Sequence, residues 1–224
     1  MTDHLRRWCE TREQVPWHDV RHGRGWPRSP VQARRDGVTH RITTVEHGRE
    51  PLRAQRLLAA YEQMRADATA DKALDFELLA RWQRNILGVA RAPFRSGPAF
   101  AKRGRERYGL DTDTPARLEV CLAGSRDPAL PVASRAARAY LDVCFFHPFA
   151  DGNARSALLA LAFVLAKADI VLDQVGPLAQ LQRPVDDPEA AKRMADLVVT
   201  LIENTQRRFE ASSTSHCRYA PREL

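Results

Sequence analysis

An apolar stretch in the second half of the chain constrains the fold more than any other feature. From Ala154 to Ala168, the only polar side chains are Arg155, Ser156 and Lys167. A helix that is apolar on every side belongs inside a globular core. The sequence therefore predicts a buried helix with other helices packed around it.

A short polar motif lies directly before that helix. It reads His147-Pro148-Phe149-Ala150-Asp151-Gly152-Asn153-Ala154-Arg155 and follows an amphipathic stretch over 132–146. Proline cannot continue a helix, because its ring clashes with the preceding turn and it has no N–H to donate. The motif is therefore predicted to be a tight loop at the start of the buried helix. Helix starts attract anions through free N–H groups and the helix dipole.

The residue types in this loop suit phosphate chemistry. His147 can accept a proton near neutral pH, as a general base must. Asp151 is a hard oxygen ligand suited to Mg²⁺, and Gly152 lets backbone N–H groups approach an anion. Asn153 is a candidate N-cap, and the Arg155 guanidinium can bind a phosphate bidentately. Each residue alone also fits a simple capped turn, but together they favour a phosphate-binding catalytic site.

The motif resembles the signature of the Fic/Doc family, His-Pro-Phe-x-Asp-Gly-Asn-x-Arg. That resemblance implies an all-α fold, a Fic-like helical bundle with a short β-hairpin flap before the motif. It also implies transfer of AMP from ATP to a hydroxyl of a target protein, or of phosphate as in Doc proteins. His147 would deprotonate the hydroxyl, and Asp151 would hold Mg²⁺. Gly152, Asn153 and Arg155 would bind the phosphates of ATP or another nucleotide.

Two positions depart from the family pattern. Ala154 stands where the family usually has Gly or Lys, and Leu158 stands where AMP-transferring members usually have a second arginine. Doc-like members also lack that second arginine, but they usually carry Lys at the position of Ala154. The identity of the transferred group therefore stays open, with AMP placed narrowly ahead of phosphate.

A segment rich in proline and glycine precedes the motif. It reads Ala92-Pro93-Phe94-Arg95-Ser96-Gly97-Pro98-Ala99-Phe100, which excludes a helix and suits a β-hairpin or an irregular loop. It resembles the flap that Fic proteins use to pair with the backbone of their target. The resemblance makes Phe94, Arg95, Ser96 and Gly97 candidate flap and target-binding residues. A surface loop without contacts is the alternative.

The control of such a domain can also be examined in the sequence. Many Fic proteins are inhibited by a helix written Ser/Thr-x-x-x-Glu-Gly/Asn, whose glutamate pairs with the second arginine. The nearest approach here, Thr200-Leu201-Ile202-Glu203-Asn204, is one residue too short, and Leu158 removes the arginine. A separate antitoxin-like partner, or no such control, fits the sequence better.

Composition narrows the class of protein. The 224 residues carry a net charge of +7, which favours anionic partners. The basic residues are spread along the chain, so a nucleic-acid-binding role rests on charge alone. Four well-separated cysteines fit a reduced cytoplasmic protein better than a zinc site. The N-terminus lacks the apolar region of a signal peptide, and no apolar run is long enough for a membrane span.

Three segments are predicted along the chain. Residues 1–50 form an aromatic and basic N-terminal extension, 51–210 form the Fic-like domain, and 211–224 form a disordered tail. Within the domain, helices are predicted from Leu52, after Asp75 as far as Gly88, over 114–122 and 132–146, after the motif, and over 188–208. In the extension, tryptophans are predicted to pack against the domain, with a lid or a substrate-recognition segment as the alternative, and 38–45 to form a short strand.

Four functions remain in competition. A nucleotidyltransferase acting on a protein is placed first, and a phosphotransferase second. A small-molecule acceptor is the third, since Pro93 and Pro98 each remove a backbone donor from the flap. A degenerate domain that binds a nucleotide or a partner without turnover is the fourth, with Ala154 and Leu158 in its favour.

Overall fold

The computed structural model describes residues 2–20, 26 and 30–217 and is mostly helical, as the sequence predicted. The helices are α1 (His4–Arg12), α2 (Gly37–Arg41), α3 (His47–Arg49), α4 (Pro51–Thr69), α5 (Phe76–Leu87), α6 (Thr114–Ala123), α7 (Val132–Phe146), α8 (Asn153–Ala166), α9 (Gly176–Gln180) and α10 (Pro188–Cys217). Short turns of 3₁₀-helix occur at Trp17–Asp19 and Gly124–Arg126, and a π-helical segment, η2, at Ile42–Glu46. Strands β1 (Ala99–Ala101) and β2 (Glu106–Tyr108) form one antiparallel hairpin.

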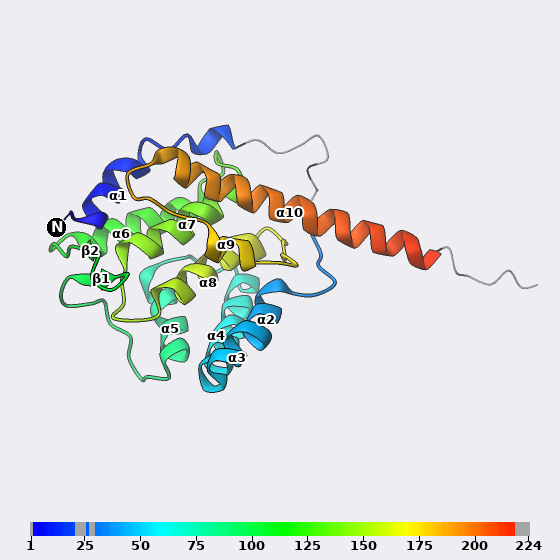
Figure 1. Ribbon diagram of the computed structural model, residues 1–224, viewed down its shortest axis with the longest axis horizontal. Helices are drawn as coiled ribbons and strands as arrows, with labels where there is room; N and C mark the ends of the chain where they lie inside the picture. The colour runs from blue at the N-terminus through cyan, green and yellow to red at the C-terminus, as the bar shows by residue number, and fades with distance from the viewer. Residues whose placement is uncertain (1, 21–25, 27–29, 218–224) are drawn as a thin grey trace, which may run out of the picture.

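Helices α7 and α8 form the centre of the fold (Figure 1). They pack against each other; α7 also contacts α1, α6 and α10, while α8 contacts α4 and α5. Leu159, Leu161, Phe163 and Leu165 of α8 are all buried. The predicted buried helix is therefore confirmed, and the loop between α7 and α8 is held at the core by both helices.

Helix ends follow the signals in the sequence. Asp75 caps α5, its Oδ1 accepting the N–H of Leu78 at 2.7 Å. The same helix ends at Gly88, whose φ of +68° is a conformation that glycine adopts without strain. Helix α4 begins at Pro51, a position where proline's missing N–H costs nothing.

The N-terminal extension packs on the domain through two tryptophans. Trp8 on α1 is 1% exposed, and its ring stacks on Phe145 of α7 with centroids 4.6 Å apart. Trp17 is also buried and donates its indole N–H to the carbonyl of Arg12 at 3.1 Å. Both tryptophans pack against the domain, as predicted. The same segment contains a helix, α1, that was not predicted.

The predicted strand over 38–45 is wrong. Those residues belong to α2 and η2. Asp36 caps α2, its Oδ1 accepting N–H groups of Val38 at 2.9 Å and Thr39 at 3.0 Å. Thr44 donates its hydroxyl to the carbonyl of His40 at 2.7 Å. Capping and these side-chain bonds outweigh the strand preference of β-branched residues.

The hairpin before the motif is confirmed, but it lies later than the Ser-Gly turn. Ala99 pairs with Tyr108 and Ala101 with Glu106. The turn between the strands contains Lys102, Arg103 and Gly104, all with positive φ. Residues 92–98 form an irregular approach to β1.

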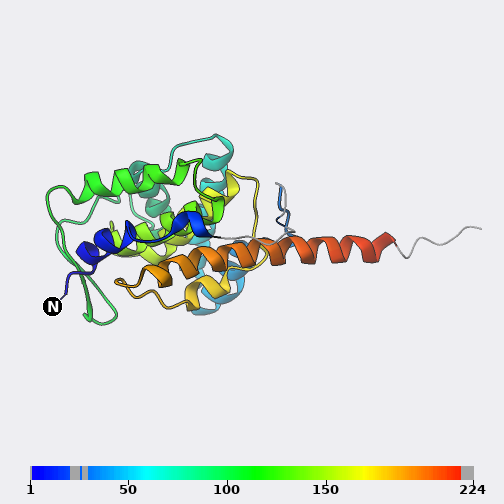
Figure 2. The same cartoon turned by 90° about the horizontal axis from the view of Figure 1, so that it is seen from above.

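Helix α10 is longer than predicted. It runs through residues 211–217, which the sequence assigned to a disordered tail, and its end projects past the helices around it (Figures 1 and 2). Residues 218–224 lie outside the described part of the chain.

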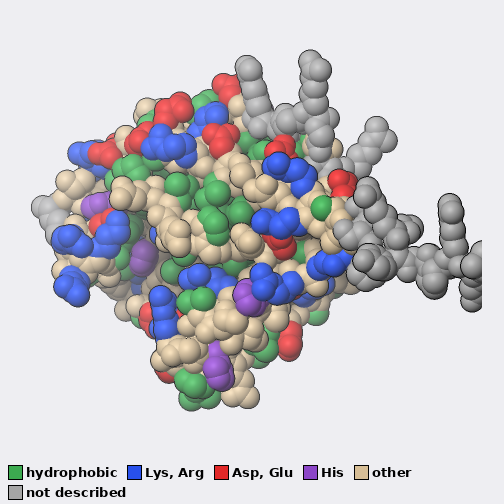
Figure 3. All heavy atoms as spheres, turned by 45° about the vertical axis from the view of Figure 1, so that its right-hand side comes forward, with side chains coloured by type: hydrophobic (Ala, Val, Ile, Leu, Met, Phe, Trp, Pro, Cys, Tyr) green, Lys and Arg blue, Asp and Glu red, His purple; other side chains and the backbone are tan. Residues whose placement is uncertain are grey.

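The surface mixes charges of both signs. On the face in Figure 3, lysine and arginine side chains are interspersed with acidic ones instead of gathering in a single patch. Within residues 2–20, 26 and 30–217, no helix is both long and apolar enough to cross a membrane.

Candidate functional site

His147 lies at the C-terminal end of α7. Its backbone is left-handed, with φ of +46° and ψ of +56°, which ends the helix and turns the chain into Pro148. The side chain lines two cavities at once, one toward the flap and the other toward the N-terminus and α9. A histidine in this place can meet a ligand from either side.

One ring nitrogen of His147 is committed to the backbone. Nδ1 lies 2.5 Å from the carbonyl oxygen of Cys144. A carbonyl only accepts, so Nδ1 must carry the proton and Nε2 of the neutral ring keeps its lone pair. Burial lowers the pKa of His147 below its usual value, outweighing the opposing effect of the Cys144 bond. The ring is therefore neutral at pH 7, in the form that can accept a proton at Nε2.

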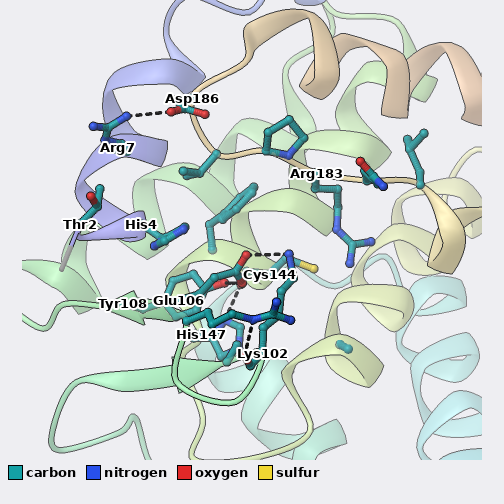
Figure 4. A pocket seen from close by; sticks show the side chains of 18 of the residues that line it. Thr2, His4, Arg7, Lys102, Glu106, Tyr108, Cys144, His147, Arg183 and Asp186 are labelled. Atoms are coloured by element: carbon teal, nitrogen blue, oxygen red, sulfur yellow. Dashed lines mark hydrogen bonds and ion pairs between the residues drawn. The ribbon is translucent and has the colours of Figure 1, made fainter.

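Tyr108 of β2 fixes the plane of that ring. The two rings stack with centroids 4.2 Å apart and an interplanar angle of 15°. The Tyr108 hydroxyl donates to Oε2 of Glu106 at 2.7 Å, and Glu106 pairs through Oε1 with Lys102 at 2.7 Å. Burial raises the pKa of Tyr108, so the hydroxyl stays protonated. Figure 4 shows these hairpin side chains gathered around His147.

Gly152 begins α8 in a conformation that requires glycine. Its φ is +80°, and a Cβ there would meet Nε2 of Gln83 at 2.6 Å. Gln83, fully buried on α5, donates to the carbonyl of Asp151 and accepts from the Ser156 hydroxyl, both at 2.5 Å. Gln83 thus holds the loop against α5, and the first turn of α8 keeps backbone N–H groups without intrahelical acceptors.

Asn153 is not the N-cap that the sequence suggested. The N-cap position is Gly152, and Asn153 is the first residue of α8. The Asn153 amide is 5% exposed and bonds both backbone groups of Phe149: Nδ2 donates to its carbonyl at 2.8 Å, and Oδ1 accepts its N–H at 2.9 Å. Asn153 lines the cavity toward the flap, but its side chain fixes the shape of the loop.

Asp151 and Arg155 face one another across the first turn of α8. Arg155 donates through Nη2 to Oδ2 of Asp151 at 3.1 Å and through Nη1 to the carbonyl of Ile86 at 3.2 Å. The Asp151 side chain is 77% exposed and lines the flap-side cavity. In the described part of the chain, no cluster of three or more histidine, cysteine or acidic side chains could hold a metal ion. One accessible carboxylate is the kind of site that binds Mg²⁺ together with phosphate oxygens.

Arg95 is bound mainly to backbone carbonyls of the flap and the motif. Its side chain is buried, and its guanidinium donates to carbonyls of Gly97 at 2.5 Å, His147 at 2.8 Å, Phe146 at 3.3 Å and also Gly109. Its own N–H donates to the carbonyl of Pro148 at 2.9 Å. Three of these contacts, to Phe146, His147 and Pro148, tie the flap to the backbone at the motif. Binding of a target by this side chain remains a prediction.

The other predicted flap residues divide in two. Phe94 is partly buried and packs against Phe76, with ring centroids 5.2 Å apart. Ser96 is exposed and Gly97 partly exposed, and both line the motif cavity, which lies between the flap and the loop 149–155. All four candidates line this cavity, and Ser96 is the one that is exposed to an approaching molecule.

Two cavities meet at His147. The motif cavity, about 810 Å³, lies between the flap and the loop 149–155 and includes Arg53. The hairpin cavity, about 990 Å³, lies between α1, the hairpin and the loop before α10 (Figure 4). His4, Lys102, Arg105 and Arg183 are among its lining side chains. Ala154, like His147, lines both cavities, and its small side chain takes up little room between them.

Leu158 lies one turn further along α8. It is partly buried and packs against the hydrophobic core. The second arginine of the family pattern therefore has an apolar replacement that contributes no charge to the motif cavity.

Three residues of the site were missed in the sequence. Gln83 and Arg53 lie on predicted helices, but nothing in the periodicity distinguishes them from neighbouring polar residues. Tyr108 follows a basic run and carries no motif. The position of Tyr108 as an aromatic residue in the hairpin before the motif was the only sequence signal for a ring stacked on His147.

Comparison with known proteins agrees with this geometry. The model of the Fic/DOC family matches residues 73–165. No significant match is found among curated protein sequences.

Solved Fic domain structures share the fold at low sequence identity. A Fic domain containing signaling protein from Bacteroides thetaiotaomicron is 16% identical, with a TM-score of 0.54, covering 70% of this chain and 69% of its own. Fic-1 from C. elegans is 15% identical, with a TM-score of 0.53 and coverages of 95% and 72%. IbpAFic2, solved in complex with adenylylated Cdc42, is 12% identical, with a TM-score of 0.55 and coverages of 89% and 69%.

Proposed function

We propose that this chain, whose residues 73–165 match the model of the Fic/DOC family, transfers AMP from ATP to a hydroxyl of a target protein. His147 is the general base, and the loop Asp151–Arg155 holds the phosphates. IbpAFic2, which has the same fold, is found with an adenylylated protein. That relationship supports a protein as the acceptor.

One observation carries the proposal. His147 keeps Nε2 free by donating Nδ1–H to Cys144, and the same side chain lines the cavity formed by the start of α8. A proton acceptor and a helix start with an arginine in its first turn thus share one cavity. This is the combination that attack of a hydroxyl on a phosphate requires.

The chemistry of the step follows from that placement. Nε2 of His147 takes the proton of the acceptor hydroxyl as its oxygen attacks the α-phosphorus of ATP. A new P–O bond forms, the bond to the bridging oxygen breaks, and pyrophosphate leaves. Arg155 and the N–H groups of the first turn of α8 stabilise negative charge on the phosphate oxygens.

Asp151 is the residue that would hold Mg²⁺. Its carboxylate is accessible and its Oδ2 pairs with Arg155, which fits an ion that takes one or two carboxylates and completes its shell with phosphate oxygens. When bound, the ion offsets charge on the phosphates. Orientation of the nucleotide rests on Arg155 and the loop backbone.

Transfer of phosphate is the second candidate. The burial of Leu158 against the core favours it, since the motif offers one arginine where AMP-transferring relatives usually have two. The same base would then act on the γ-phosphorus, and ADP would leave.

The acceptor class is testable by mass spectrometry. The protein is incubated with ATP, Mg²⁺ and a cell lysate, and both proteins and metabolites are searched for an added AMP or phosphate mass. We expect AMP on a protein, absent with His147→Ala. Modified metabolites alone would assign a small-molecule acceptor, and no modification in either fraction would favour the binding-module alternative. An antitoxin-like partner remains a prediction of the sequence.

A further inference from the structure

Arg53 reaches the motif cavity from a different helix. It lies in the first turn of α4, which packs beside α5 and α8 (Figure 1), and it lines the same cavity as Asp151, Gly152 and Arg155. Its side chain is 43% exposed overall, but its Nε atom is buried and has no hydrogen-bond partner. That Nε lies 3.9 Å from Oε2 of Glu46, which is too long for a hydrogen bond, and burying an N–H without a hydrogen bond is costly.

The carboxylate nearest to Arg53 is shared. Glu46 lies 3.7 Å from Arg41, 3.8 Å from Arg49 and 3.9 Å from Arg53, all longer than a hydrogen bond. Its Oε2, the atom facing Arg53, is buried without a hydrogen-bond partner. One carboxylate thus serves three guanidinium groups, and Arg53 keeps most of its bonding capacity.

Arg53 and Arg155 also act on one another. Burial is the main cause that lowers the pKa of Arg155, and the positive charge of Arg53 lowers it further. Two cations facing one cavity repel each other, and an anion between them would replace repulsion with two attractions. The cavity is therefore electrostatically suited to a ligand with more than one negative charge.

The position of Arg53 in its helix supports the same conclusion. Cations in the first turn are disfavoured by the helix dipole; α4 has no acidic residue within that turn, and its N-cap is Glu50. A bound anion would offset both the dipole and the guanidinium. A helix start that also carries a guanidinium attracts an anion.

We propose that Arg53 is a second phosphate-binding arginine of the site, which holds the phosphate groups beyond the one bound by Arg155. Leu158 supplies no such group from α8, and Arg53 supplies it from α4. The ligand class is a compound with at least two linked phosphates. This inference rests on the proposed function for its role in turnover, but its binding test does not require turnover.

The test measures dissociation constants by calorimetry with the full chain and Mg²⁺. The probes are inorganic pyrophosphate, ADP and AMP. Replacing Arg53 with alanine should weaken pyrophosphate and ADP about tenfold or more, as expected for loss of a charge-assisted contact. AMP should change less than about twofold, because Arg155 and the start of α8 bind a single phosphate.

Arg49→Ala is the matched control. Arg49 pairs with the same carboxylate, is 69% exposed and does not line the motif cavity, so this variant should bind all three probes as the unaltered protein does. Arg53→Lys keeps the charge but loses the planar guanidinium. Its affinity for pyrophosphate and ADP should therefore lie between those of the unaltered protein and Arg53→Ala. Unchanged melting temperatures would show that each variant is folded.

The outcomes separate this inference from the proposed function. Equal affinities for Arg53→Ala and Arg49→Ala, an equal loss for AMP and ADP, or no binding of pyrophosphate by the unaltered protein would each overturn the role of Arg53. Arg53-dependent binding without transfer to any acceptor would uphold the inference while contradicting the function. If Arg53→Ala changed neither transfer nor ADP binding, the proposed function would be upheld and the role of Arg53 would be overturned.

Discussion

The ring of Tyr108 lies nearly parallel to that of His147, 4.2 Å away. The proposed base is therefore held between a hairpin ring and the carbonyl of Cys144, which fixes both its plane and its tautomer. A base held in this way loses little orientational freedom when a substrate arrives.

Removing the aromatic ring should slow the reaction. Tyr108→Leu is expected to lower kcat about tenfold with little change in KM for ATP, since a stacked pair contributes roughly 0.5–1.5 kcal/mol. Tyr108→Phe keeps the ring and loses only the bond to Glu106, so it should stay within about twofold to threefold. Steady-state kinetics of the two variants measure the difference. Equal kcat values for Leu and Phe would show that stacking does not position the base.

The pH dependence of transfer should reflect the lowered pKa of His147. The base works in its neutral form, and burial shifts its protonation below the ordinary value of 6.5. Activity should therefore persist at pH 6.5 and fall only as pH drops through the lower, folded-state pKa. A profile of kcat/KM against pH measures the midpoint. A midpoint above 6.5 would contradict burial as the dominant influence.

Gln83 should support both the loop and the activity. Gln83→Leu removes bonds to the Asp151 carbonyl and the Ser156 hydroxyl, and leaves both groups unsatisfied. The expected loss in free energy of unfolding is about 1–3 kcal/mol, with a lower kcat from the displaced loop. Denaturant unfolding and kinetics test both effects. Gln14→Leu is the control, because Gln14 makes one exposed bond to Glu10.

The N-terminal extension should be important for stability. Arg12 donates to Asp142 of α7 through Nε at 2.8 Å and Nη2 at 3.1 Å, and Asp142 is fully buried. Arg12→Met would leave that carboxylate buried with only the Trp8 indole as a partner, at a cost of about 3–5 kcal/mol.

Thermal and denaturant unfolding measure this cost. The control is Arg6→Met, which breaks the exposed pair with Glu10 and should cost less than about 1 kcal/mol. Equal effects of the two substitutions would mean that α1 contributes little to the stability of α7.

The sequence was informative wherever a feature is local. The apolar pattern after Ala154 identified the central helix, and Asp75 and Gly88 marked the ends of α5. The motif predicted that His147, Asp151, Gly152 and Arg155 lie together, and they line one cavity, because residues that share one turn are adjacent in sequence.

Features that depend on distant contacts were missed or misassigned. Gln83 and Arg53 reach the motif from α5 and α4, and neither helix has a pattern that marks its cavity-facing positions. Arg95 was a candidate target-binding residue because its segment resembles the Fic flap, and its burial could not be read from the sequence. Its guanidinium bonds four backbone carbonyls. The strand predicted over 38–45 failed because Asp36 caps a helix there.

The most direct test of the central claim uses two samples of ATP, one labelled on the α-phosphate and one on the γ-phosphate. Each is incubated with the protein, Mg²⁺ and a cell lysate, with His147→Ala in parallel. We expect protein labelled from the α-phosphate alone, and none with His147→Ala. Label from the γ-phosphate alone would contradict AMP transfer in favour of phosphate transfer. Unchanged labelling by His147→Ala would contradict His147 as the base.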